Sequence, residues 1–397
     1  MKILNIKSYR LFTSILLLQL FFGCSEDRGW TLLEDGLEKL KPIKNAQVIN
    51  GHGQALIKYE LESTQDLLYV KAEYLMANGK MRVVKSSQYK NEILIDGFPD
   101  TQSHEVKLYA VNKAEVQSEP VSVSVNPKIP IFDLVFSKLN VAPTFGGVRI
   151  TSINEHKGDV VIVPLVDKEN IGEFEPLDNY YSNDSLITYN IRGLQPKEMK
   201  FAFYVRDRWL NTSDTLYTSV TPFAEFLMDR TLFSVLRLPN DAQFMWDTRV
   251  DMIWDNDMNP YKWPSLYSQE SASEPQSITF SIGKEAQLSR IVIFPRRENG
   301  FYDKGNLRNF EVWGTNNPSL DGSFDSWEKL GTYTVIKPSG TPLGTNTGAD
   351  DAYATAGWSF DLPETGKKYK YIRIRNLRNW RGSYFIQMLQ VQLWGTY

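Results

Sequence analysis

The sequence predicts an all-β protein, and three observations lead to this prediction. Apolar and polar residues alternate with period two in many short runs, as they do in strands that bury one face. Asn, Asp, Gly and Pro fill the gaps between these runs, as turns require. A pattern of turn and strand residues also occurs twice in the first half of the chain. The length of 397 residues suits two or three β domains.

The first residues have the composition of a targeting segment. Basic residues precede an apolar run from Leu11 to Phe22, which is too short to span a bilayer as a helix. The run is followed by Cys24, the only cysteine of the chain. Residues 1–24 therefore resemble a bacterial lipoprotein signal peptide, which implies lipidation of Cys24 and an anchor in the outer membrane. An ordinary cleaved secretory signal is the alternative.

Residues 25–41 are expected to form a linker. Its acidic start, Ser25–Asp27, resembles the surface-export signal of Bacteroidota lipoproteins, although a solvated linker would have the same composition. Leucines at spacings close to helical predict a short helix between Asp27 and Leu40. Pro42 ends this helix, because proline cannot continue the backbone hydrogen bonds.

Two stretches of similar pattern follow, residues 42–127 and 128–222. Each has a glycine turn with a proline, then an aromatic or apolar strand, then a serine. The segments are Ile95–Pro99, Val106–Asn112 and Ser118 in the first stretch, and Ile191–Pro196, Phe201–Asp207 and Ser213 in the second. The offset of about 95 residues is close to the length of one small β-sandwich. Both stretches resemble fibronectin type III domains, and Pro127–Pro130 divides them, because proline is excluded from central strands.

The last part of the chain, residues 223–397, carries apolar runs that predict antiparallel strands. The runs are Ser277–Ile282, Ser289–Phe294, Asn309–Trp313, Tyr369–Ile374 and Leu389–Gly395. An acidic and amide-rich turn bounded by aromatics, Ile253–Trp263, precedes them. In this order the pieces resemble the discoidin family, also called coagulation factor 5/8 type C, which overlaps with carbohydrate-binding module family 32. The resemblance implies a discoidin-like (galactose-binding-like) β-sandwich jelly roll that binds carbohydrate.

Composition and motifs favour a binding protein over an enzyme. The formal net charge of -3 gives no reason to expect nucleic acid as a partner. The three histidines, His52, His104 and His156, lie apart in the first two stretches, so no histidine base is expected in the last part. The sequence has no serine-hydrolase elbow, zinc-binding helix or phosphate loop. Paired carboxylates from distant strands stay open as an alternative.

Candidate ligand-binding residues lie in loops of the last part, where aromatic side chains meet arginines that can hydrogen-bond a sugar. The resemblance implies two such loops, one after Phe294 and one after Asn379. The predicted residues are Arg296, Arg297, Tyr302, Trp380, Arg381 and Tyr384. Tyr261 and Trp263 are a third candidate group. The alternative for each arginine is a surface charge, and for each aromatic a packed strand end.

The same resemblance implies a structural calcium ion as cofactor. The matching residues are Asp255, Asp257, Asn259 and Gln390. Calcium takes six to eight oxygen ligands, which an Asp-Asn-Asp turn can help to supply. Gln390 stands where the family has a glutamate, so it offers an oxygen without a charge. A turn that is only well capped is the alternative.

The chain as a whole resembles surface lipoproteins of polysaccharide-utilisation systems in Bacteroidota. This resemblance implies a non-catalytic, lipid-anchored and surface-exposed protein that captures a glycan. Its other expected partners are a TonB-dependent importer and the lipoprotein partner of that importer, and its contact with the membrane is through the anchor. Many copies on one surface would raise a weak single-site affinity. The alternative is a structural or adhesion protein that binds another surface protein.

Overall fold

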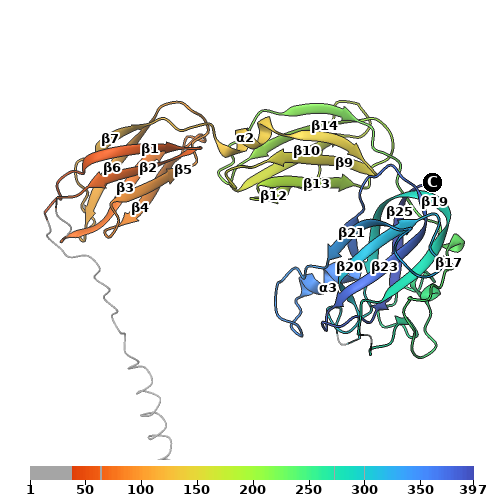
Figure 1. Ribbon diagram of the computed structural model, residues 1–397. Helices are drawn as coiled ribbons and strands as arrows, with labels where there is room; N and C mark the ends of the chain where they lie inside the picture. The colour runs from red at the N-terminus through yellow and green to blue at the C-terminus, as the bar shows by residue number, and fades with distance from the viewer. Residues whose placement is uncertain (1–37, 63–64, 272, 299) are drawn as a thin grey trace, which may run out of the picture. The chain divides into compact units, whose positions relative to one another are not determined.

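In the computed structural model the chain is almost entirely β (Figure 1). The structure describes residues 38–62, 65–271, 273–298 and 300–397. The signal peptide, Cys24 and nearly all of the predicted linker helix lie outside these ranges. No helix among the described residues is long and apolar enough to span a membrane.

Two compact units make up the chain. Of the described residues, the first contains those up to Leu134 together with Gly158–Val161 and Val205–Ser213, and the second contains the remainder. The strands form three β-sandwiches. The first sandwich lies in the first unit, the second contributes residues to both units, and the third lies in the second unit. The fold class predicted from the sequence, two fibronectin-like sandwiches followed by a discoidin-like one, is confirmed.

Strands β1 to β7 form the first sandwich. Their bounds are β1 Lys44–Gly51, β2 Gln54–Glu60, β3 Leu67–Leu75, β4 Met81–Ser87, β5 Glu92–Asp96, β6 His104–Asn112 and β7 Val121–Val125. One sheet has the order β1-β2-β5 and the other β4-β3-β6-β7. The residues that alternate inward from the two sheets, such as Ile57, Ile95, Val70 and Leu108, form one core, as in other aligned sandwiches.

The second sandwich repeats this plan after a short helix. The elements are α2 Ile131–Ser137, β8 Asn140–Thr144, β9 Gly147–Ile153, β10 Val160–Asp167, β11 Glu175–Pro176, β12 Tyr180–Ser182, β13 Leu186–Arg192, β14 Met199–Arg206 and β15 Leu216–Val220. One sheet has the order β13-β9-β8, and the other β11-β10-β14-β15 with β12 beside β10. The sequence did not predict α2.

The repeat extends to individual hydrogen bonds. The backbone N–H of Ala110 donates to Ser118 Oγ at 3.0 Å, and that of Val205 donates to Ser213 Oγ at 2.9 Å. The turn glycines also agree, since Gly97 has φ 88° and Gly193 has φ 80°, a region that favours glycine. The internal repeat predicted from the sequence is therefore confirmed.

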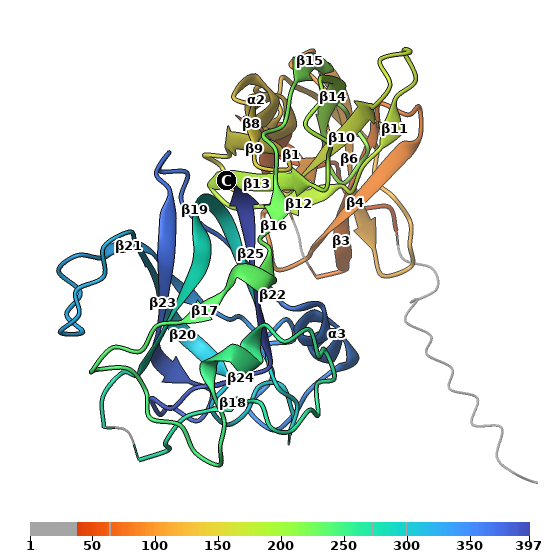
Figure 2. The same cartoon turned by 90° about the vertical axis from the view of Figure 1, so that its right-hand side faces the viewer.

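The third sandwich contains the remaining elements (Figure 2). These are β16 Phe226–Leu227, η1 Arg230–Leu232, β17 Ser234–Val235, η2 Val250–Ile253, β18 Leu266–Tyr267, β19 Ser277–Phe294, β20 Leu307–Thr315, β21 Glu328–Thr334, α3 Gly348–Ala356, β22 Trp358–Asp361, β23 Tyr369–Asn379, β24 Gln387–Met388 and β25 Gln390–Thr396. The main sheet has the order β16-β25-β19-β23-β20-β21, with β17 and β22 also paired to β19, and β18 pairs with β24.

Strand β19 differs from the prediction, which had two strands at 277–282 and 289–294. The structure has one continuous strand, whose first part pairs with β23 and whose second part pairs with β25. The register shifts between Ser281 and Ala286, around Gly283. Gly283 has φ 82°, and a Cβ there would lie 2.6 Å from the carbonyl oxygen of Leu232. The glycine thus allows a bend where a break was predicted.

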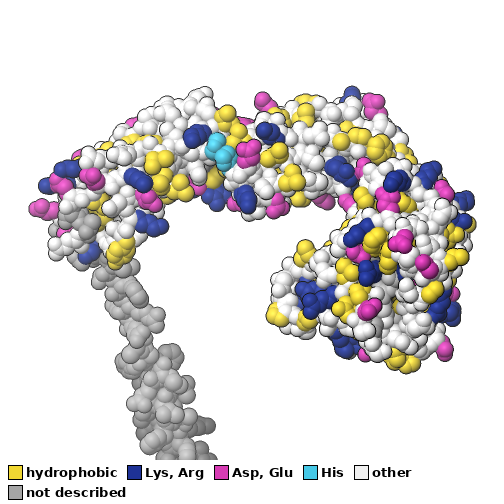
Figure 3. Space-filling model, in the orientation of Figure 1, with side chains coloured by type: hydrophobic (Ala, Val, Ile, Leu, Met, Phe, Trp, Pro, Cys, Tyr) yellow, Lys and Arg dark blue, Asp and Glu magenta, His cyan; other side chains and the backbone are white. Residues whose placement is uncertain are grey.

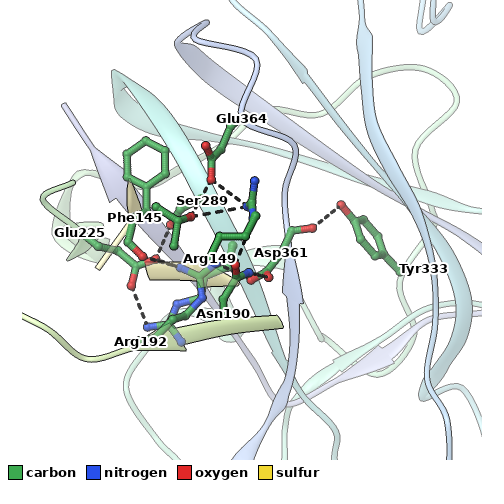
Figure 4. A network of polar contacts seen from close by, with 11 residues as sticks. Phe145, Arg149, Asn190, Arg192, Glu225, Ser289, Tyr333, Asp361 and Glu364 are labelled. Atoms are coloured by element: carbon green, nitrogen blue, oxygen red, sulfur yellow. Dashed lines mark hydrogen bonds and ion pairs between the residues drawn. The ribbon is translucent and has the colours of Figure 1, made fainter. Parts of the chain in front are cut away.

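A polar network joins the second and third sandwiches inside the second unit (Figure 4). Arg192 of β13 donates to Glu225 at 3.0 Å and to Asp361 of β22 at 2.5 Å. Arg149 of β9 donates to Glu364 at 2.8 Å. The Glu225 side chain is only 4% exposed, so its charge depends on these partners. The network occupies the end of β22 that lies away from Trp358.

Candidate functional site

Loops gather at the end of the third sandwich where β18 and β24 pair, away from the C-terminus in Figure 2. They are the segments 242–249, 254–265, 295–306 and 380–386. Bridges between Phe244 and Ser268 and between Asn306 and Gln387 hold the first, third and fourth loops beside that pair. Segments that are far apart in the sequence therefore form one surface.

Two buried asparagines fix the shape of the predicted ligand loops. Asn306 accepts a hydrogen bond from the backbone of Arg296 and donates to the carbonyls of Arg296 and Phe301 at 2.7 and 2.9 Å. Asn379 accepts from the backbones of Arg381 and Ser383 at 3.0 and 2.9 Å. These bonds satisfy backbone groups that would otherwise be buried without partners, so both loops have defined conformations.

An aromatic cluster lies on the surface of these loops, and we define it as Trp246, Tyr261, Trp263 and Tyr267. Trp246 is 56% exposed, Tyr261 58% and Trp263 50%. The Trp246 ring lies 5.8 Å from that of Trp263 and 5.0 Å from that of Tyr267, which is buried. The exposed Trp246 ring therefore packs on the buried Tyr267 ring and lies beside the exposed Trp263 ring.

Arg296 and Arg297, which the sequence predicted as ligand residues, adjoin this cluster. The guanidinium of Arg296 lies 5.1 Å from the Trp263 ring and donates to the Lys262 carbonyl at 2.9 Å. The guanidinium of Arg297 lies 5.7 Å from the Tyr261 ring and is half-exposed. A guanidinium over an aromatic ring is attracted to its face, so the rings and cations hold one another in place.

Tyr302 and Trp380, also predicted as ligand residues, lie in the hydrophobic core. Tyr302 is 3% and Trp380 is 5% exposed, and their rings meet at 5.0 Å. The Tyr302 hydroxyl donates to the Asp350 carbonyl at 2.9 Å, and burial raises the pKa of Tyr302 to about 12. Because neither ring presents a face to solvent, the prediction that they stack on a ligand does not fit this structure.

Arg381 and Tyr384 lie on the fourth loop, at the rim of the cluster. The exposed Arg381 side chain donates to Asp303 at 3.1 Å, and this hydrogen bond raises the pKa of Arg381. Tyr384 is half-buried, and its backbone carbonyl accepts from Asn376 at 2.8 Å. Their roles in binding stay predictions.

The Asp255 turn is a ladder of capped turns. Asp255, Asp257 and Asn259 each accept a hydrogen bond from the backbone N–H two residues later, at 3.1, 3.0 and 3.1 Å. Such side-chain bonds mimic a backbone turn and favour the observed loop. One oxygen of each of these side chains therefore serves the local backbone.

An ammonium group already lies beside Asp255. Lys262 Nζ contacts one carboxylate oxygen, and Gln390 Nε2 donates to the other at 2.7 Å. Burial acts to raise the pKa of Asp255, but the hydrogen bonds from Lys262 and Gln390, with that of the Asp257 backbone, outweigh it and hold the pKa below its usual range. The described part of the chain has no group of three His, Cys, Asp or Glu side chains that could hold a metal. The residues predicted for calcium thus do not fit it as they lie here.

Trp246 and Tyr267 belong to the cluster but were not among the predicted ligand residues. Trp246 and the following Asp247 have φ of 51° and 60°, in the left-handed region that a bulky residue adopts only when its surroundings hold it there. The abundance of tryptophan in the last part of the chain was the only signal for Trp246 in the sequence. The Trp246 side chain is exposed because of the turn at Trp246 and Asp247, and no sequence pattern predicts this turn.

Three sequence families match consecutive parts of the chain, and each is described only as a domain of unknown function. They are DUF4959 over residues 41–127, DUF5126 over residues 128–231 and DUF5000 over residues 254–395. No curated protein matches the chain.

Among solved structures, a SusE-like protein is 30% identical to the chain, and the match covers 67% of this chain and 99% of that one with a TM-score of 0.45. A putative chitobiase fragment from Bacteroides thetaiotaomicron is 18% identical over 43% of this chain and 93% of the fragment, with a TM-score of 0.30. An F5/8 type C domain from Bacteroides fragilis is 14% identical over 43% of this chain and 97% of that domain, with a TM-score of 0.30.

Proposed function

Because the chain belongs to the family of the SusE-like protein, with which it shares 30% identity over 99% of that protein's length, we propose that it is a non-catalytic glycan-binding protein of the cell surface. The binding site is the aromatic cluster of the third sandwich. By the proposal, Cys24 carries the lipid that anchors the chain to the outer membrane. The protein captures glycan beside a TonB-dependent importer and its lipoprotein partner.

The exposed indoles of Trp246 and Trp263 are the observation that carries this proposal. Single exposed aromatic side chains are common on protein surfaces, but here two exposed indoles are adjacent, and a contiguous apolar patch of this kind marks a binding site. The apolar face of a sugar ring can stack on an indole, while its hydroxyls accept hydrogen bonds from Arg297 at the edge of the cluster. A shallow surface of this kind suits a polymer that lies along it.

The carboxylate of Glu298, beside the cluster, favours binding over hydrolysis. A glycosidase needs one carboxylic acid whose pKa is raised, so that it can protonate the leaving group. Burial acts to raise the pKa of Glu298, but Lys304 and Arg296 outweigh that effect and lower it. Glu298 is therefore held as a carboxylate, which suits it for fixing Arg296 at 2.8 Å.

An adhesion role is the second candidate, and one feature of the second sandwich favours it. Leu186 and Ile153 oppose each other across β13 and β9, and they are 67% and 45% exposed. An exposed aliphatic pair of this kind offers contact to a protein more readily than to a glycan. This surface is far smaller than a stable interface, so we place it second.

The proposal is tested with the full chain on a glycan array, followed by titration calorimetry against each glycan that binds. We expect Trp246→Ala and Trp263→Ala to weaken binding at least about tenfold, which corresponds to ~1.4 kcal/mol. The matched control is Tyr217→Ala, which removes an aromatic ring that is 68% exposed on the second sandwich. Folded protein that binds no glycan, or variants that bind like the control, would contradict the proposal and favour adhesion.

A further inference from the structure

The charges around the aromatic cluster restrict the chemical class of its ligand. We infer that the cluster takes a neutral glycan, without carboxylate or sulfate groups, an inference that rests on the function proposed above. Figure 3 shows Lys and Arg side chains intermixed with Asp and Glu side chains on the visible face of the third sandwich. Individual cations and carboxylates beside the cluster also form ion pairs.

The cations that adjoin the cluster have carboxylate partners. The pairs are Lys262 with Asp255, Arg296 and Lys304 with Glu298, Arg297 with Asp351, and Arg381 with Asp303. The two pairs nearest the open surface, those of Arg297 and Arg381, each have a nitrogen and an oxygen 3.1 Å apart. Each of these positive charges is thus accompanied by a negative charge at hydrogen-bond distance.

An anionic ligand attracted to one of these arginines would therefore also be repelled by the carboxylate paired with it. A carboxylate or sulfate that contacts Arg297 would also lie within a few ångströms of Asp351. Two like charges about 4 Å apart repel by ~1 kcal/mol in water and by ~4 kcal/mol near a protein surface. The gain from the arginine and the cost from the aspartate are of similar size, so an acidic glycan obtains little net attraction.

A hydroxyl group does not meet this difficulty. A guanidinium has five N–H donors in a fixed plane, and the ion pair with Asp351 does not occupy all of them. A sugar hydroxyl can accept from a remaining donor and can also donate to the carboxylate. Paired arginines and aspartates thus present both donors and acceptors, which is what a polyhydroxylated, uncharged ligand requires.

The hollow beside Trp246 also has no excess of positive charge. Its volume is about 390 Å³, and Asp247, Asp251, Arg237 and Arg249 line it. Arg249 is paired with Asp251 at 3.1 Å, while Arg237 donates to the amide oxygen of Gln243 at 2.6 Å. Asp241 also lines the hollow, so a ligand that extends into it from the cluster would meet three carboxylates and two arginines, which likewise disfavours an anionic chain.

Titration calorimetry with the full chain tests the inference. Neutral polysaccharides are compared with polysaccharides of similar backbone that carry uronate or sulfate, each at about 0.1 M and about 1 M salt. We expect neutral glycans alone to bind, with a Kd that changes less than about twofold between the two salt concentrations. Binding of an acidic glycan that weakens severalfold with salt would overturn the inference and leave the proposed function standing. Absence of binding to every glycan would overturn both.

A double variant tests the charge argument directly. Asp351→Asn with Asp303→Asn keeps the side-chain shapes but leaves Arg297 and Arg381 without their carboxylates. We expect this protein to gain at least about fivefold in affinity for the acidic glycans at low salt. The control is Glu328→Gln, which frees Lys367 outside the cluster. If the double variant gains no more than the control, the paired carboxylates do not set the selectivity and the inference fails.

Discussion

Arg373 and Asp241 form an ion pair inside the third sandwich, with Nη2 and Oδ1 3.2 Å apart. The Arg373 side chain is fully buried and that of Asp241 is 4% exposed. Arg373 also donates to the carbonyl of Gly322 at 2.8 Å, and Asp241 accepts from the Leu238 backbone and from Thr279. The two charges therefore depend on each other and on these hydrogen bonds.

Replacing Arg373 is expected to destabilise the third sandwich strongly. Arg373→Leu would leave the Asp241 carboxylate buried without its cation, which typically costs ~3–5 kcal/mol. Chemical denaturation followed by tryptophan fluorescence measures the loss. Adding Asp241→Asn to Arg373→Leu removes the uncompensated charge, so the double variant should recover part of the stability. A double variant less stable than Arg373→Leu would contradict this explanation.

Gly283→Ala should destabilise the protein by more than the positive φ of residue 283 alone would explain. The residue has φ 82°, and the new Cβ would lie 2.6 Å from the Leu232 carbonyl oxygen. We expect a loss of more than about 1–2 kcal/mol, because backbone strain and a clash add. Gly366→Ala is the matched control, since Gly366 has φ 71° with nothing within 4 Å of the new Cβ. Equal losses of stability at both sites would show that the clash with Leu232 does not contribute.

Ser118→Ala and Ser213→Ala are expected to cost similar free energy in the two fibronectin-like sandwiches. Each change removes the acceptor of a buried backbone N–H, that of Ala110 or of Val205, at a cost of ~1–3 kcal/mol. Hydrogen exchange of these two amides reports the loss locally. Ser122→Ala, at an exposed serine of β7, should leave both amides protected. A loss in one sandwich without the other would show that the repeated bond differs in importance.

Stability should fall as the pH rises above about 10. Burial raises the pKa of Tyr74, Tyr302 and Tyr333 to about 12, whereas a tyrosine of the unfolded chain ionises near 10. Between these values the unfolded chain loses protons that the folded chain keeps. The contribution of these tyrosines to the free energy of unfolding is therefore complete below about pH 10 and disappears as the pH approaches 12. Unfolding free energy measured across this range should decrease, and Tyr74→Phe should make the slope shallower. Tyr89→Phe, at an exposed residue, controls for the loss of a phenol.

Chelation should leave the melting temperature unchanged. Lys262 and Gln390 already satisfy the Asp255 carboxylate, so the turn needs no metal to neutralise it. Lys262→Met removes that cation and should lower the melting temperature with and without chelator. A fall on chelation that added calcium reverses would show instead that the side chains rearrange around a calcium ion, as the resemblance to discoidin domains implies.

The sequence allowed the strands to be predicted because a half-buried strand shows its period-two pattern locally. The turn glycines Gly97 and Gly193 also appear in the sequence as a repeated motif, and both have the expected left-handed conformation. Strand β19 was predicted as two strands, because Gly283 and the polar residues around it look like a turn. Nothing local distinguishes a bend that keeps its sheet partners from a loop.

The site was harder to predict, because the exposure of an aromatic side chain depends on distant parts of the chain. Trp380 and Trp263 both follow strand or loop residues of similar polarity, yet Trp380 is 5% and Trp263 50% exposed. Trp380 is buried because Tyr302, from another loop, packs against it at 5.0 Å. The predicted Arg296 and Arg297 lie beside the exposed rings of Trp263 and Tyr261, and their roles in binding stay predictions.

The network of Arg192, Glu225 and Asp361 has a consequence for how the protein melts. Because these residues tie the strands of two sandwiches into one compact unit, neither sandwich can lose its structure without leaving charges of the other uncompensated. Differential scanning calorimetry of a chain with three sandwiches should therefore show two heat-absorption peaks, with the larger enthalpy in the unit that contains the network. Substituting Arg192 with Met should split that larger peak, since the two sandwiches could then melt at separate temperatures.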